Sequence, residues 1–270
     1  PAGYIAIDSV ADLLAIPEDP DGSYILMADL DLSGYDWEPL CPDRENLFSG
    51  VFDGNGHVIS NLNGSNGLFG YVWNGEIRDV GLENAFISAD YDYNVSSIIG
   101  GIAAYCQNDT TISNCYFQGD IDTNAYIVGG IVGEANSFAP VEYCWMEGDI
   151  YSDNPGVSYM YGVRLGGIVG QSSPSDDLTI HGCIHSGSIV GECKGMSAGG
   201  IGGQVRGTIS NCQNYGSITH YTRSASIGGI TCGRWDCVVE SCMNAADISY
   251  VIEPDRVASA PDIGGITATQ

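Results

Sequence analysis

Basic residues are scarce in this chain: its 270 residues include 8 Lys+Arg against 34 Asp+Glu, which gives a formal net charge of −26. A protein this acidic is repelled by the phosphates of nucleic acids and by anionic membrane surfaces. High negative charge also favours solubility, which is the simpler reason for the excess. We therefore expect no nucleic-acid partner.

Long apolar runs are missing as well. No stretch of 18 or more apolar residues occurs, so we expect no segment of this sequence to insert into a membrane. A basic, apolar leader is also absent, and the start at Pro1 is typical of a mature or trimmed chain. At the other end, Gly264-Gly265-Ile266 begins a repeat that is not completed, which predicts a fragment cut from a longer chain.

Catalytic signatures are few. The sequence has four histidines, and none belongs to a His-Glu-x-x-His motif: His57, His181, His185 and His220. The nearest approach to a pair of catalytic carboxylates is Asp176-Asp177, close to His181. Polysaccharide lyases usually need basic residues, and no Lys or Arg recurs with the repeats described below. We expect that the chain is not an enzyme, and a polysaccharide lyase or hydrolase is the third of three interpretations.

Metal ligands are also sparse. Asp19-Pro20-Asp21-Gly22 and Asp29-x-Asp31 supply carboxylate oxygens, but neither forms a full EF-hand loop. No Cys-x-x-Cys pair or histidine set indicates zinc. We expect no cofactor, with calcium as a weak alternative.

Glycine-rich repeats are what the sequence does contain. The pentapeptide Gly129-Gly130-Ile131-Val132-Gly133 recurs at six starts, which are 29, 37, 33, 29 and 36 residues apart: Gly100, Gly129, Gly166, Gly199, Gly228 and Gly264. Periods of this length are typical of solenoids. Glycine suits places where the backbone bends or approaches a neighbouring coil closely.

A cysteine follows each complete start, with an apolar residue three positions before it and an isoleucine six positions after it. These cysteines are Cys115, Cys144, Cys183, Cys212 and Cys242. The segments around them are short, rich in Ile and Val, and alternate apolar with small or polar residues, which predicts strands and not helices. Short strands of constant register can bury their inward side chains by stacking coil upon coil. We predict an all-β, right-handed parallel β-helix, or β-solenoid.

Five of the 10 cysteines therefore share one repeat position. Coils about 4.8 Å apart would place them in an inward column, where parallel Cβ vectors do not favour disulfides. We predict reduced, buried thiols that pack as small apolar groups, as Val80 does in the preceding copy. Cys232 and Cys237 are the best disulfide candidates, while Cys41, Cys106 and Cys193 stay unassigned.

The N-terminal segment differs from the repeats, so we divide the chain into residues 1–47, a cap with the first strands, and residues 48–270, the solenoid. Ser9 is placed to cap a short helix that carries Val10, Leu13 and Leu14 on one side. We expect this helix to cover the end of the apolar core.

The repeats resemble the GLUG-motif family, named for a Gly-Leu-apolar-Gly core. Gly67-Leu68-Phe69-Gly70 and Gly130-Ile131-Val132-Gly133 fit this core directly, whereas Gly101-Ile102-Ala103-Ala104 lacks the last glycine. The resemblance covers roughly residues 50–270. It implies a secreted or surface-attached bacterial protein, often an adhesin or a region that accompanies immunoglobulin A1 peptidases.

Tyrosine recurs in the variable segments between each isoleucine and the next glycine pair: Tyr91, Tyr93, Tyr126, Tyr151, Tyr159, Tyr161, Tyr221 and Tyr250. In repeat proteins such segments collect on one face, which commonly binds ligands. Tyrosine supplies rigid contact area with a polar tip. We predict these residues as a binding face, and the alternative is that the rings only cover strand edges.

The leading hypothesis is a non-enzymatic, monomeric module outside the cell or on a bacterial surface, which binds a host or neighbouring-cell protein or glycan. A structural spacer without a ligand is the second interpretation. The sequence leaves open the ligand, the means of anchoring and the organism.

Overall fold

Strands make up nearly all of the regular structure. The computed structural model describes residues 3–91, 97–154, 162–175, 177–193, 195–221, 225–233, 236–251 and 262–267. Within them the helices are α1 (Val10–Leu14) and the 3₁₀ turn η1 (Ile16–Glu18). The chain is therefore all-β with one short α-helix, as predicted.

The strands form four parallel sheets in the described part of the chain. Sheet A contains β1 (Ile5–Ile7), β2 (Ser23–Leu26), β4 (Val51–Asp53), β8 (Glu76–Arg78), β12 (Thr111–Ser113), β16 (Val141–Glu142), β21 (Leu178–His181), β26 (Gly207–Ser210) and β30 (Cys237–Glu240). Sheet B contains β3 (Leu30–Asp31), β5 (Val58–Ser60), β6 (Asn63–Gly64), β9 (Gly81–Ala89), β13 (Tyr116–Thr123), β17 (Trp145–Glu147), β18 (Ile150–Ser152), β22 (Ile184–Ser186), β23 (Ser188–Gly191), β27 (Gln213–Asn214), β28 (Ser217–His220), β31 (Met243–Asn244) and β32 (Ile248–Tyr250).

The other two sheets are smaller. Sheet C contains β7 (Phe69–Trp73), β11 (Ala103–Gln107), β15 (Val132–Ala135), β20 (Val169–Ser172) and β25 (Gly202–Gln204). Sheet D contains β10 (Ile98–Gly100), β14 (Ile127–Gly129), β19 (Val163–Gly166), β24 (Met196–Gly199), β29 (Ala225–Gly228) and β33 (Asp262–Gly264).

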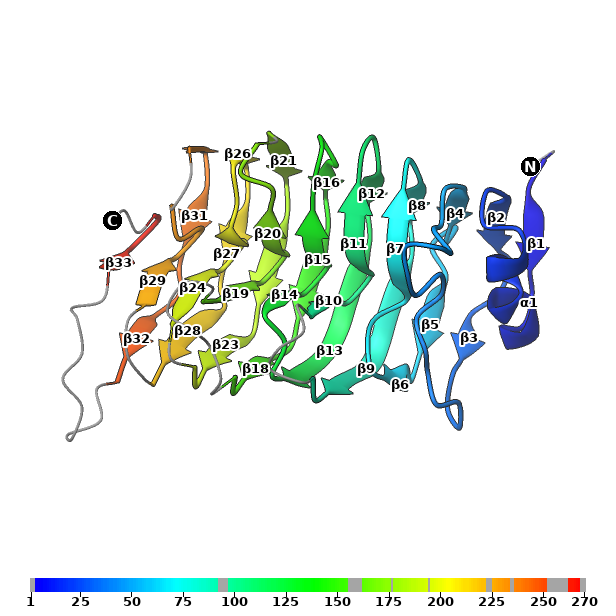
Figure 1. Cartoon of the computed structure of the whole chain (residues 1–270), viewed down its shortest axis with the longest axis horizontal. Helices are drawn as coiled ribbons and strands as arrows, with labels where there is room; N and C mark the ends of the chain where they lie inside the picture. The colour runs from blue at the N-terminus through cyan, green and yellow to red at the C-terminus, as the bar shows by residue number, and fades with distance from the viewer. Residues whose placement is uncertain are drawn as a thin grey trace.

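The chain visits the sheets in a fixed order, and we call one passage through the sheets a coil. It runs from β10 in sheet D through β11 in C, β12 in A and β13 in B, and then returns to sheet D as β14. Successive coils lie side by side along the long axis of the molecule, with the two termini at opposite ends (Figure 1). β2 pairs with β4 in sheet A, so the N-terminal strands and the repeats share one sheet. Parallel strands stacked coil upon coil are consistent with the predicted solenoid.

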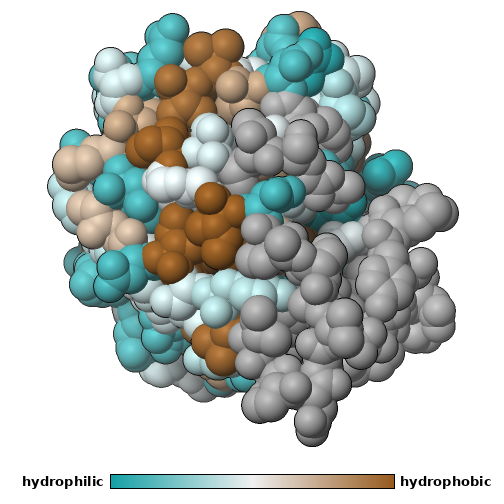
Figure 2. Space-filling model, turned by 90° about the vertical axis from the view of Figure 1, so that its left-hand side faces the viewer, coloured by the Kyte–Doolittle hydropathy of each residue, from teal (hydrophilic) through white to brown (hydrophobic). Residues whose placement is uncertain are grey.

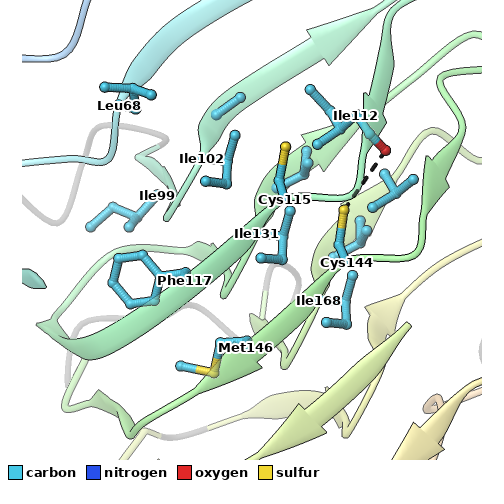
Figure 3. Close-up of a cluster of buried hydrophobic side chains, with 14 of the residues drawn as sticks. Leu68, Ile99, Ile102, Ile112, Cys115, Phe117, Ile131, Cys144, Met146 and Ile168 are labelled. Atoms are coloured by element: carbon cyan, nitrogen blue, oxygen red, sulfur yellow. Dashed lines mark hydrogen bonds between the residues drawn. The ribbon is translucent and has the colours of Figure 1, made fainter. Parts of the chain in front are cut away.

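The repeat register read from the sequence is the register of strand pairing. Ile112 pairs with Val141, and the column continues through Ile180, Ile209 and Val239. A second column runs through Ile121, Ile150, Ile189, Ile218 and Ile248. Except at the last coil, these side chains are buried in the interior, with those of Ile102, Ile131 and Ile168 (Figure 3). Equivalent side chains therefore pack on one another along the whole stack.

The paired glycines allow neighbouring coils to approach closely. Gly167 has no positive φ, but a Cβ built on it would lie 2.2 Å from the carbonyl oxygen of Gly200 in the next coil. Gly130 meets the oxygen of Gly167 in the same way, at 2.2 Å. Glycine is required at this position because of space between coils and not because of backbone handedness, in line with the close approach that we expected.

A left-handed residue precedes each of the five column cysteines, and also Val80 in the coil before them, where the chain turns from sheet A into sheet B. Its φ values lie between 53° and 64° in six successive coils: Asp79, Asn114, Tyr143, Gly182, Asn211 and Ser241. Asparagine, aspartate and glycine adopt this conformation most easily, which accounts for four of the six residues. The sequence analysis did not identify this column, although Asn-Cys at 114–115 and 211–212 was its signal.

The two ends of the stack differ. At the N-terminal end the side chain of Ser9 accepts a hydrogen bond from Asp12 N and caps α1, while Leu13 and Ile16 are fully buried. The predicted cap is correct except for Leu14, which is 46% exposed. At the other end Figure 2 shows apolar patches at the surface. In the last described coil Val238 and Met243 are 53% and 43% exposed.

The glycine column predicts a position-dependent effect of one methyl group. Gly167→Ala should lower the free energy of unfolding by roughly 1–3 kcal/mol, because its Cβ collides with backbone of the next coil. Gly265→Ala is the matched control in the same column, since a Cβ there meets nothing within 4 Å, and it should change stability by less than about 0.5 kcal/mol. Urea unfolding measures both, and equal effects would contradict the packing argument.

Candidate functional site

The described tyrosines of the predicted binding face lie in strands of sheet B or in the segments that follow them. These are Tyr91, Tyr126, Tyr151, Tyr221 and Tyr250. Tyr93, Tyr159 and Tyr161 lie outside the described residues. Tyr151 lies within β18 and Tyr250 within β32, whereas the other three follow a strand of sheet B.

These rings do not form one regular column. Tyr91, Tyr126 and Tyr250 are partly buried and pack against the core, whereas Tyr221 is exposed. Tyr151 pairs in register with Asp122, and Tyr250 with buried His220. The tyrosines thus occupy different coil positions, contrary to the constant position assumed from the sequence, because they follow the column-cysteine position of their coil at different distances and some lie within a strand of sheet B. Their binding role stays a prediction.

A different aromatic pair lies on the outer face of sheet B. Tyr116 of β13 and Trp145 of β17 are partners in register, and their rings stack with centroids 4.3 Å apart at 8°. The Tyr116 ring lies over Gly81, where a Cβ would come within 2.0 Å of it. Its hydroxyl donates a hydrogen bond to Glu83 Oε1 at 2.6 Å. Burial, and after it the Glu83 carboxylate, raise the pKa of Tyr116 to about 12, so the hydroxyl remains a donor.

A groove of about 440 Å³, which we call the turn groove, begins at this ring. It follows the turns between sheets A and B across three coils and is lined by Asp53, Asn55, Gly56, Asp79, Val80, Gly81, Asn114 and Tyr116. Its polar groups already bind one another: Arg78 pairs with Asp53 at 2.7 Å, and Asn114 Nδ2 donates to Asp79 Oδ1 at 3.2 Å. The groove is therefore acidic, rigid and aromatic on one side.

The sequence analysis missed this surface. Its signal was an aromatic residue directly after a column cysteine in two successive copies, Cys115-Tyr116 and Cys144-Trp145. Because the rigid segments have constant register, residues at the same offset from the cysteine must be neighbours in the sheet.

The residues considered for catalysis in the sequence each bind a different partner. Asp177 pairs with Arg206 at 3.4 Å, and His181 Nδ1 lies 2.9 Å from Ser210 Oγ, so each contacts the next coil. Asp176 lies outside the described residues. His57 forms an exposed pair with Asp29, at 3.0 Å from Nδ1 to Oδ1. These pairs hold neighbouring coils together.

The candidate calcium ligands are likewise used within the fold. Asp31 accepts hydrogen bonds from Ser33 N and Asn61 Nδ2, each at 2.8 Å. Asp19 shares a hydrogen bond with Asp21, which raises the pKa of Asp19. In the part of the chain that is described, no three His, Cys, Asp or Glu side chains gather as a metal site.

The five column cysteines occupy equivalent positions, and the structure records all five as free thiols. Each thiol is near the carbonyl two residues before it and a carbonyl of the preceding coil. For Cys144 these are Glu142 O at 3.3 Å and Ile112 O at 3.8 Å (Figure 3). Burial raises the pKa of the Cys144 thiol, which keeps it protonated and able to donate.

The predicted Cys232–Cys237 disulfide is wrong, because Cys237 is a free thiol. Burial raises the pKa of Cys237 to about 12, and the nearby Cys232 adds to the rise. The two cysteines are therefore close in space. Closeness across a turn does not by itself provide the Cβ geometry that a disulfide requires.

His185 is buried in a column that changes from apolar to polar. It pairs in register with Met146 of the preceding coil and with Asn214 of the next, whose Oδ1 lies 2.8 Å from His185 Nδ1. Asn214 Nδ2 in turn donates to Asn244 Oδ1 at 2.7 Å. Burial lowers the pKa of His185, against the opposing effects of Asn214 and Asp149. This histidine is a neutral structural residue.

Comparison with known proteins first supports the class of fold. The solved structures that share it include a Bacteroides ovatus protein provisionally assigned as an immunoglobulin A1 protease, and a protein named IgA1 protease. The first has a TM-score of 0.76 and 22% identity and covers 98% of this chain and 84% of its own. The second has a TM-score of 0.70 and 18% identity, and the match covers 95% of this chain and 21% of the other chain. At these identities the likeness concerns the fold alone.

A sequence relative adds a second comparison. Halomucin of Haloquadratum walsbyi is 35% identical in an alignment of 123 positions that covers 38% of this chain and 1% of halomucin. The chain therefore spans about 1% of the length of this curated relative. No protein-family model matches the chain, so the resemblance to GLUG repeats stays a prediction. Among the described residues the helices are too short and too polar to cross a bilayer.

Neutral, buried His185 predicts sensitivity to acid. Because its pKa is lower in the folded chain than the value of about 6.5 in the unfolded chain, stability is lost as the pH falls below that value. Its Nε2 has no partner among the described residues, so a proton there would be buried without an acceptor. His185→Asn, which continues the amide column, should reduce the difference in unfolding free energy between about pH 7.5 and pH 5. An unchanged difference would contradict the prediction.

The thiol column predicts that reductant matters little. Cys144→Ala should cost on the order of 1 kcal/mol for the lost buried sulfur, whereas loss of a disulfide costs roughly 2–4 kcal/mol. Thiol titration in denaturant, without reductant, checks the redox state. Fewer than five reactive thiols would mean that at least one column cysteine is oxidised, because only five of the 10 cysteines lie outside the column.

Proposed function

We propose that this chain is a non-enzymatic binding module of the adhesin type, displayed outside the cell or at its surface, which recognises a protein or glycan. The observation that carries the proposal is the outer face of sheet B, where the stacked pair Tyr116–Trp145 adjoins the acidic turn groove. Aromatic rings beside fixed polar groups are typical of recognition surfaces.

The architecture we infer is a right-handed parallel β-helix. Crossover connections between parallel strands are right-handed in about 98% of cases. The stacked coils hold the outer face rigid, because the described strands are paired on both sides except where a sheet begins or ends. A rigid scaffold lowers the entropy lost on binding.

A surface location is supported by the names of the similar proteins: a halomucin, a protein provisionally assigned as an immunoglobulin A1 protease, and a protein named IgA1 protease. The net charge of −26 suits a soluble module that keeps away from anionic lipid. Asp177, His181 and His57 each contact a residue of a neighbouring coil, which favours binding over catalysis as the role of this chain.

A spacer without a ligand is the second candidate. The observation that favours it is the continuous stacking of equivalent residues, since a stack of coils extends without a new core. The spacer and the binding module differ in whether outward aromatic residues matter for attachment.

The proposal predicts that the purified module binds to cells or immobilised glycoproteins. Trp145→Ala should weaken this binding about tenfold, since truncating an aromatic anchor commonly costs more than 1 kcal/mol. A combined Tyr126→Ala and Tyr221→Ala variant tests the predicted tyrosine face instead. Circular dichroism and melting temperature control for folding. Absence of binding by the unmodified module would contradict the proposal and favour the spacer.

A further inference from the structure

A second groove, which we call the asparagine groove, lies in the N-terminal coils. It has a volume of about 570 Å³ and is lined by Ser33, Gly34, Tyr35, Asp36, Asn61, Leu62, Asn63, Asn84 and Phe86. Its volume is within the range of about 300–1,000 Å³ that is typical of ligand sites. Two of its aromatic side chains are open to solvent, Tyr35 at 45% and Phe86 at 44% exposure.

One wall of the groove is a turn that is fixed at both ends. Asp31 accepts hydrogen bonds from Ser33 N at 2.8 Å and Ser33 Oγ at 2.9 Å. Gly34 supplies the positive φ of 86° that the turn requires. After the turn, Trp37 is buried and its Nε1 donates to Gly67 O at 2.9 Å. Tyr35 is therefore held between two anchored points.

The floor is a chain of side-chain hydrogen bonds across three coils. Asn84 Nδ2 donates to Asn61 Oδ1 at 2.5 Å, and Asn61 Nδ2 donates to Asp31 Oδ1 at 2.8 Å. Asn61 and Asn84 both adopt the left-handed conformation, with φ of 61° and 51°. The hydrogen bond from Asn61, the largest of several causes, lowers the pKa of Asp31. The Asp31 carboxylate, which ends this series of hydrogen bonds, therefore stays ionised. The amides are thus preorganised before any ligand arrives.

Other polar groups of the groove are open. Among the described residues, no hydrogen-bond partner contacts the Tyr35 hydroxyl, the Asp36 carboxylate or the Asn63 amide. The backbone of the opposite wall is already paired: Trp37 N donates to Asn63 O, and Phe86 N donates to Leu62 O. The groove therefore offers side-chain donors and acceptors but no strand edge on which a peptide could add a strand.

This combination matches the chemistry of a sugar. A pyranose ring has apolar C–H faces, which can lie on the rings of Tyr35 and Phe86, and peripheral hydroxyls that both donate and accept hydrogen bonds, as amides and carboxylates require. Asp31, Asp36 and the net charge of −26 oppose uronic, sialylated or sulfated sugars. We propose that the asparagine groove binds a neutral glycan, with Tyr35 and Phe86 as stacking surfaces and Asn63 and Asp36 as hydroxyl ligands. This assignment rests on the binding function proposed above and adds to it a second site, separate from the Tyr116–Trp145 face, with its ligand class.

The test is titration of the whole chain with a panel of neutral oligosaccharides (cellotriose, maltotriose, mannotriose and chitotriose) and with sialyllactose as the acidic probe. We expect at least one neutral oligosaccharide to bind and sialyllactose to bind weakly or not at all. Phe86→Ala and Tyr35→Ala should each weaken binding about tenfold, which corresponds to 1.4 kcal/mol, and Phe86→Tyr should retain it. Phe138→Ala is the matched control, because Phe138 is 65% exposed and lies outside the groove.

The exposure of Tyr35 and Phe86 means that these variants should keep the melting temperature of the parent chain, so that a loss of binding is not a loss of folding. Neutral oligosaccharide binding that survives both alanine changes, or no binding by any neutral oligosaccharide, would overturn the site. If the site fails in either of these ways, cell or glycoprotein binding that persists in the same variants still supports the binding function. Attachment that is lost in the groove variants but is unchanged after glycans are removed from the target would contradict a glycan ligand. It would assign a polypeptide ligand to the groove instead.

Discussion

The close contact of parallel backbones between successive coils is the constraint on which the rest of the structure depends. Strands hydrogen-bond to the coils before and after them, and at the paired glycines the approach leaves no room for a Cβ, as at Gly130 and Gly167. This contact fixes the register of every coil relative to the next. Residues at equivalent positions therefore form columns, and each side chain must pack against its neighbours in the coils before and after it.

The columns explain how polar groups are accommodated inside. His185 replaces an apolar residue and is followed by Asn214 and Asn244, so that His185 and Asn214 each find a partner in the next coil. A single polar residue in such a column would be buried without a hydrogen bond, which is costly. The same rule holds outside, where Asn61 and Asn84 continue a chain of hydrogen bonds that begins at Asp31. Binding surfaces arise where such outward columns meet exposed rings.

Much of the interior could be predicted from the sequence. The isoleucines six residues after each cysteine are in register because the segment that joins them has constant length. The surfaces were harder to predict. The tyrosines follow the column-cysteine position at different distances, some within a strand of sheet B and some after it, so equal order in the sequence did not mean equal position. The Tyr116–Trp145 stack was hidden in the segment assigned to the core. The error at Leu14 has a similar cause, because helical spacing says which residues share a side but not how far the covered core extends.

The sequence by itself determined the all-β class, the repeat and the identity of the inward columns, since these follow from apolar spacing and from glycine at fixed intervals. Only the tertiary structure decided which outward residues meet. Tyr35 and Phe86 are 51 positions apart in the chain and line one groove, and Cys237 is a free thiol although Cys232 stands five residues before it. The physical reason is that side-chain contacts across coils depend on the path of turns and variable segments, which local sequence patterns do not fix.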